Sequence, residues 1–178
     1  MNTSNRDLLE AVGFAARAHQ GQLRKDKETP YATHPFRVCL VVRDIFGFDD
    51  RRMLITALLH DTIEDTTIDF DDVEERFGTE IAQWVAYLTK DMRLPDAERE
   101  RAYVENLKKA PWQVQVCKLA DIFDNLTDSD KLSLSRRSHQ LKRSELYFAQ
   151  LRQMSEPAAQ RAIELVALLI EEVRAKTS

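Results

Sequence analysis

The sequence predicts a single all-α domain. The 178 residues include only four glycines and five prolines, and long runs of Val, Ile and Thr, which are typical of strands, are absent. Several segments instead carry apolar residues at the spacing of one helix face. A chain of this length fits one domain and can bury a substantial core. We therefore expect one domain over residues 1–178, built from about eight or nine helices.

The expected helices are bounded by capping residues and helix breakers. Either Asp49 or Asp50 is suited to cap the third helix, which we expect to continue through residues 60–65. Asp69 and Thr79 are candidate N-caps, and Gly78 ends a short helix between them. In chain order, helices are predicted over residues 7–20, 35–47, 50–65, 69–77, 79–89, 98–109, 113–127, 136–154 and from 157 onward.

The last of these helices has the most regular apolar pattern. Its apolar residues recur at i, i+3, i+4, i+7, i+8 and i+11, which is one face of an amphipathic helix. This face can pack either on the core or on a second copy of the chain, so a homo-oligomer is compatible with the pattern. The residues are Ala162, Leu165, Val166, Leu169, Ile170 and Val173.

Composition excludes several classes of protein. The net charge is −4 with no basic block, so binding to nucleic acid has little electrostatic support. No N-terminal signal pattern and no apolar run of about 18 residues is present, which predicts a cytoplasmic protein without a membrane partner. Cys39 and Cys117 each lie among apolar residues and are expected to be reduced core residues.

One short stretch concentrates charge. His60 and Asp61 are followed four residues later by Glu64 and Asp65. On a continuous helix, residues four apart lie one above the other, so His60 would lie over Glu64 and Asp61 over Asp65. Three carboxylates and an imidazole that are buried close together repel one another, which costs free energy. A bound divalent cation relieves that cost. The stretch therefore predicts part of a metal site.

Two distant residues can complete the set. His34 begins the second helix, and Asp121 interrupts an otherwise apolar helix, where an unpaired carboxylate would be costly. Together with His60 and Asp61 they form a His2Asp2 group. Mixed imidazole and carboxylate ligands favour Mn, Fe, Zn, Ni or Co over Ca.

The order His…His-Asp…Asp resembles the HD superfamily of metal-dependent phosphohydrolases. Within it, the chain is similar to the RelA/SpoT-type hydrolases, especially the stand-alone small alarmone hydrolases that lack a synthetase domain. The resemblance implies an all-α fold and Mn²⁺-dependent removal of the 3′-pyrophosphate of guanosine tetra- and pentaphosphate, with release of GDP or GTP and pyrophosphate. Four segments carry it: residues 18–25, 30–35, 60–65 and 118–121, the last followed by Asn125.

The resemblance also implies a role for each matching residue. The metal ligands would be His34, His60, Asp61 and Asp121, and water activation and positioning would fall to Glu64 and Asp65. The small-molecule nucleotide would be bound by six further residues: Arg24 and Lys25 beside the base, Tyr31 and Asn125 along the ribose, and Arg143 and Tyr147 towards the 5′-phosphates. From the residues alone, the first pair also fits a solvated loop and the last an ordinary amphipathic helix.

One departure from the family pattern leaves more than one substrate possible. The family often has Arg or Lys after the Asp of Lys-Leu-Ala-Asp, whereas this chain has Ile122. A second hypothesis is therefore an HD phosphohydrolase for an adenine alarmone, a deoxynucleotide monophosphate or the 2′-phosphate of NADPH. A third is a nucleotide-binding protein that has kept the fold and lost the chemistry.

Overall fold

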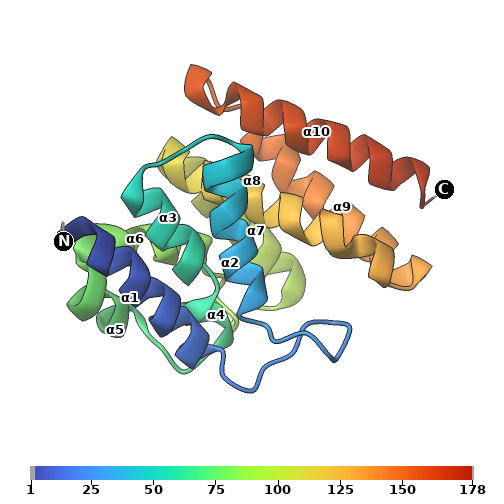
Figure 1. Cartoon of the computed structure of the whole chain (residues 1–178). Helices are drawn as coiled ribbons and strands as arrows, with labels where there is room; N and C mark the ends of the chain where they lie inside the picture. Colours follow the sequence, from blue (N-terminus) through green and yellow to red (C-terminus); the bar gives the residue numbers. More distant parts are fainter. Residues whose placement is uncertain (1–2, 178) are drawn as a thin grey trace.

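The computed structural model describes residues 3–177, and the elements in this range are all helical (Figure 1). Nine of the ten α-helices in this range have eight or more residues, and α4 is a single turn. The elements are α1 (Thr3–Ala18), α2 (Thr33–Leu40), the π-helical η1 (Val41–Ile45), α3 (Arg51–Leu59), α4 (Thr62–Asp65), α5 (Phe70–Phe77), α6 (Thr79–Leu88), α7 (Asp96–Lys109), α8 (Trp112–Thr127), the 3₁₀ segment η2 (Asp128–Lys131), α9 (Leu134–Leu151), the 3₁₀ segment η3 (Pro157–Ala159) and α10 (Gln160–Ala175).

The all-α prediction is confirmed, with α8 at the centre of the packing. This helix contacts α2, α3, α6, α9 and α10. A helix that is apolar on nearly every side is suited to such a central place. Figure 1 shows α1 beside α3 on one side of the molecule and α9 beside α10 on the other, and both pairs are in contact. The buried residues of α8 are Val114, Val116, Cys117, Leu119, Ala120, Asp121, Ile122, Asp124 and Leu126.

The predicted third helix is wrong at its C-terminal end. Helix α3 stops at Leu59, His60 is its C-cap, and Asp61 has φ −101° and ψ −3° before α4 begins. Side chains replace main-chain donors at this break: His60 Nδ1 donates to the Ala57 carbonyl at 2.8 Å, and the Thr62 hydroxyl donates to the Leu59 carbonyl at 2.7 Å. Such local bonds compete with the helical pattern. His60 therefore does not stand over Glu64 on a continuous helix.

Several other boundaries differ from the sequence prediction. Helix α1 begins at residue 3 and α2 at residue 33, α9 spans residues 134–151, and a 3₁₀ turn precedes α10. Gly78, at φ 87°, is the N-cap of α6 in place of Thr79. The predicted caps Asp50 and Asp69 are confirmed, the latter in a capping box with Asp72.

Further sequence expectations are confirmed in the core. Cys39 and Cys117 are both free and buried, and the stripe of α10 has Val166 and Ile170 in the core. Within residues 3–177, no helix is both long and apolar enough to cross a membrane. The single-domain prediction over residues 1–178 includes residues 1, 2 and 178, which lie outside the described range.

The central place of α8 leads to a stability prediction. Leu119 is fully buried, whereas Leu168 on α10 is 68% exposed. Leu119→Ala should lower the free energy of unfolding by about 3 kcal/mol, because it leaves a cavity at the centre of the packing. Leu168→Ala should change it by less than about 0.5 kcal/mol. Urea unfolding followed by circular dichroism measures both, and equal losses would contradict the central role of α8.

Candidate active site

A pocket of about 820 Å³ opens where α2, α4, α8 and α9 meet the loop that precedes α2. Eleven of the twelve residues predicted from the sequence line it, and His60 is buried beside it. The lining predicted residues are Arg24, Lys25, Tyr31, His34, Asp61, Glu64, Asp65, Asp121, Asn125, Arg143 and Tyr147. The fold therefore brings residues from Arg24 to Tyr147 together around one cavity.

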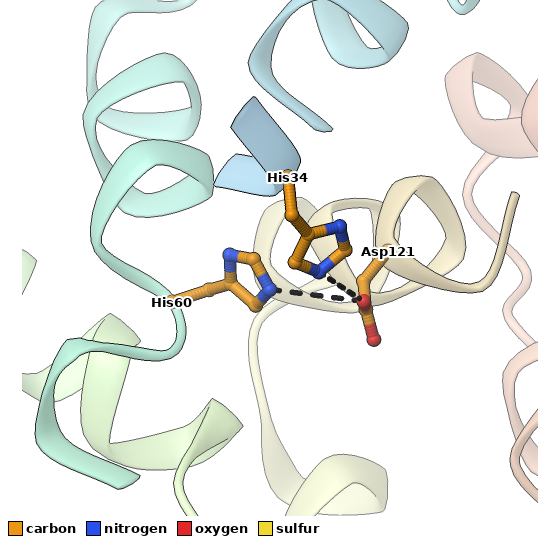
Figure 2. Close-up of side chains that lie close together, drawn as sticks. All are labelled: His34, His60 and Asp121. Atoms are coloured by element: carbon orange, nitrogen blue, oxygen red, sulfur yellow. Dashed lines mark ion pairs between the residues drawn. The ribbon is translucent and has the colours of Figure 1, made fainter. Parts of the chain in front are cut away.

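Three of the four predicted metal ligands converge at the floor of the pocket. His34 from α2, His60 after α3 and Asp121 from α8 are buried, and their ligand atoms all lie within 4.8 Å of one another. Figure 2 shows both imidazoles pointing at the same carboxylate. The distance from Oδ1 of Asp121 is 3.0 Å to Nε2 of His34 and 3.7 Å to Nε2 of His60.

The outer nitrogen of each imidazole is held by an acceptor, which sets the tautomer. Nδ1 of His34 donates to the carboxylate of Asp124 at 2.7 Å, and Nδ1 of His60 donates to the Ala57 carbonyl. The Nε2 atoms therefore face Asp121. Nε2 of His60 is buried and has no hydrogen-bond partner in the described part of the chain. A buried polar atom without a partner is costly, and a divalent metal ion at this point would satisfy it.

Asp61 lies at the edge of this group. Its Oδ2 is 3.1 Å from Nε2 of His60 and 3.5 Å from Nε2 of His34. The same oxygen accepts a hydrogen bond of 2.5 Å from the hydroxyl of Tyr31, which also lies 3.2 Å from Asp65. Asp61 is not one of the three residues whose ligand atoms converge, so its role as a metal ligand stays a prediction.

The electrostatics of the floor favour a cation. Burial acts to raise the pKa of Asp121, but the ammonium group of Lys118 and the two histidines hold it well below its usual range. Burial acts to lower the pKa of His34, yet its bonds to Asp121 and Asp124 raise it. A metal ion would compete with protons for these nitrogens, so metal binding should release protons.

The two predicted catalytic carboxylates lie on α4, at the wall of the pocket. Glu64 accepts a hydrogen bond of 2.9 Å from the backbone N–H of Lys90. Burial raises the pKa of Glu64, although the charge of Lys90 opposes the shift. Burial and the charge of Asp61 raise the pKa of Asp65. A carboxylate with a raised pKa in a polar pocket is a suitable general base.

Two lysines that the sequence analysis did not single out form part of the same wall. The ammonium groups of Lys90 and Lys118 lie between the rings of Tyr103 and Tyr147, at 5.0–5.3 Å from the ring centroids. Lys118 also pairs with Oδ2 of Asp121 at 2.6 Å. Its position three residues before Asp121 was the available signal, whereas nothing in the sequence connects Lys90 to the site.

The predicted nucleotide-binding residues lie at three places in the pocket. At one end, the guanidinium of Arg24 pairs with Asp128 at 3.1 Å, and Lys25 donates to Gln140 at 2.8 Å. The side chain of Arg24 is largely buried, whereas Lys25 is an exposed residue held by this one hydrogen bond. At the other end, the hydroxyl of Tyr147 donates to Glu100.

The remaining predicted contacts lie close to the metal group. Asn125 donates to Oδ1 of Asp121 at 2.5 Å, and Tyr31 donates to Asp61. His19 is buried and lies against the ring of Tyr31 at a centroid distance of 4.8 Å. Ile122 is buried and lines the pocket. Its apolar side chain supplies no charge at this position.

Comparison with known proteins decides the family. A family model described as an HD domain matches residues 11–155. The chain belongs to the HD-domain family. The similar proteins include human guanosine-3′,5′-bis(diphosphate) 3′-pyrophosphohydrolase MESH1. It is 42% identical over 132 residues, which make up 74% of this chain and 74% of the human protein. The MESH1 protein of Drosophila melanogaster is 40% identical over 122 residues, 68% of each chain.

A solved HD-domain structure has the same fold over almost the whole chain. It is described as a metazoan ortholog of SpoT that hydrolyzes ppGpp, and it matches with a TM-score of 0.84 at 30% identity. The match covers 93% of this chain and 94% of the other. The sequence-based assignment to this type of HD protein is thereby confirmed.

The buried histidines lead to a prediction about metal binding. His60→Gln should weaken the affinity for divalent transition metals at least about tenfold, because Nε2 of His60 is aimed at the site. His139→Gln, the same change at an exposed histidine on α9, should leave the affinity unchanged. Titration calorimetry of the metal-free protein measures both. Equal affinities for the two variants would contradict the assignment of the site.

Proposed function

We propose that this protein hydrolyses the 3′-pyrophosphate of guanosine tetra- and pentaphosphate in a metal-dependent reaction, giving GDP or GTP and pyrophosphate. The observation that carries the proposal is the convergence of His34, His60 and Asp121 below a pocket lined by Glu64 and Asp65. The relatives named for this reaction support it, because their identity of about 40% extends over most of both chains.

The proposed cofactor is Mn²⁺, held by His34, His60, Asp61 and Asp121. Two imidazoles with carboxylates suit this ion and other divalent transition metals. When bound, such an ion lowers the pKa of its water ligand and neutralises charge on the phosphate under attack. Asn125 and Lys118 each hold one oxygen of Asp121, so the direction of this carboxylate is set by two partners.

Glu64 and Asp65 are the proposed groups that handle the attacking water. Glu64 can accept a proton, since its burial raises its pKa towards neutrality while the Lys90 N–H keeps the carboxylate in place. The hydroxyl of Tyr31 connects Asp65 to Asp61, because it lies within hydrogen-bond distance of both carboxylates and can donate to either. This arrangement holds the catalytic pair at a fixed distance from the metal group.

The substrate is strongly anionic, and the remaining walls of the pocket provide the positive charge. Arg24 and Lys25 are proposed to lie beside the base, with Tyr31 and Asn125 towards the ribose. Arg143 and Tyr147 are proposed to lie towards the 5′-phosphates. Lys90 and Lys118 add two ammonium groups near Glu64 and Asp121. These two lysines provide basic groups in the pocket, whereas Ile122 provides none.

Ile122 is the observation that favours a second candidate. Without a basic residue there, another HD phosphohydrolase activity, on an adenine alarmone, a deoxynucleotide monophosphate or NADPH, would also fit a metal site of this kind. Comparison of kcat/KM over these substrates and guanosine tetraphosphate separates the two proposals. Tight nucleotide binding without product in metal-replete protein would indicate the third, a catalytically silent nucleotide-binding protein.

The central prediction concerns product release. Purified protein with Mn²⁺ should release pyrophosphate from guanosine tetraphosphate, and removal of the metal should abolish the reaction. Glu64→Gln should lower kcat at least about 100-fold because the proton acceptor is lost, while metal affinity stays within about twofold. Glu75→Gln, an exposed glutamate on α5, is the matched control. A Glu64→Gln enzyme with wild-type kcat would refute the assigned role.

The raised pKa of Glu64 predicts the pH dependence. A general base works only when deprotonated, so kcat at saturating metal should fall as the pH decreases through the pKa of Glu64. This pKa lies above the usual value of about 4.3 for glutamate. The charge of Lys90 lowers it, so Lys90→Gln should move the acidic limb to higher pH. The exposed Lys108→Gln is the control. An acidic limb that stays in place in Lys90→Gln would contradict the assignment.

A further inference from the structure

A buried carboxylate next to the metal group has no part in the chemistry proposed above. Asp124 lies on α8, three residues after Asp121, and its side chain is only 2% exposed. Its Oδ2 lies 2.7 Å from Nδ1 of His34, and its Oδ1 lies 2.6 Å from Nε of Arg37. Arg24 also lies 3.6 Å from Oδ2. Such a buried charge is retained only with paired donors.

The two histidines of the metal group differ in what holds them. His60 donates Nδ1–H to a neutral backbone carbonyl within its own turn. His34 donates to a carboxylate that reaches it from another helix. A charged acceptor fixes the tautomer and ring direction more strongly than a neutral one and makes the opposite nitrogen a better metal ligand.

A second carboxylate provides an internal comparison. Asp128 contacts the same two arginines, with Arg24 at 3.1 Å and Arg37 at 3.0 Å, but within the described residues it makes no hydrogen bond or ion pair with His34. Asp124 and Asp128 therefore share their cationic partners, but only Asp124 connects them to the metal group. Arg24 is one of the proposed nucleotide contacts, so Asp124 links this contact to the metal group.

We propose that Asp124 is a positioning residue that directs Nε2 of His34 towards the metal and holds Arg24 and Arg37 against the same wall. The inference rests on the metal site of the proposed function and does not depend on which phosphate ester is the substrate. The two arginines offset the repulsion between Asp124 and Asp121, as Lys118 does from the other side of Asp121.

The experiment compares Asp124→Asn with Asp128→Asn. Titration calorimetry with MnCl₂ on the metal-free protein should show an affinity about 10- to 100-fold weaker for Asp124→Asn. Asp128→Asn should stay within about twofold of the wild type, because it removes a charge from the same arginines without touching His34. An Asp124→Asn affinity within twofold of the wild type would overturn the proposal. So would an equal loss in both variants.

A second measurement on the wild-type protein covers the case in which Asp124→Asn does not fold. Nitrogen-15 NMR of the histidine rings in the zinc-loaded protein should show His34 with its proton on Nδ1 and its metal on Nε2. The opposite tautomer would overturn the proposal. Both measurements are independent of turnover, so an inactive protein with these results would refute the proposed substrate and leave the role of Asp124 intact.

Discussion

The structure depends on the burial of two imidazoles and a carboxylate at one point. His34, His60 and Asp121 come from three different helices and are almost completely enclosed. Polar groups in such a place must be paired, and the surrounding residues provide the pairing: Asp124 and the Ala57 carbonyl on the outer nitrogens, Lys118 and Asn125 on the carboxylate. Within residues 3–177, Nε2 of His60 has no hydrogen-bond partner, and a bound metal ion would satisfy it.

The need to pair buried polar groups also bears on how charged side chains are distributed in the pocket. Asp61, Glu64, Asp65 and Asp121 gather around the metal position together with the ammonium groups of Lys90 and Lys118, while Arg24, Lys25 and Arg143 line other parts of the cavity. A metal ion and a polyanionic nucleotide are each matched by the charge nearest to them. The weakly acidic chain as a whole gives no sign of this distribution, because it is produced by the way α8 and α9 face α4.

The sequence allowed much of this to be predicted, and the exceptions have physical causes. Asp121 could be found because an unpaired carboxylate in an apolar helix is costly, and His34 because it completes the order His…His-Asp…Asp. The break at His60 could not, because it depends on side chains that take over carbonyl groups of the last turn of α3. Lys90 and Asp124 were missed because isolated charges acquire a role only through tertiary contacts.

The most direct test of the central claim is the position of the metal itself. Crystals soaked in MnCl₂ and measured at a wavelength where manganese scatters anomalously should give one strong peak between Nε2 of His34, Nε2 of His60 and the carboxylate of Asp121. The same map decides whether Asp61 is a further ligand. A main peak at any other place, or none at this point in well-ordered crystals, would contradict the view that the buried group is built around a cation.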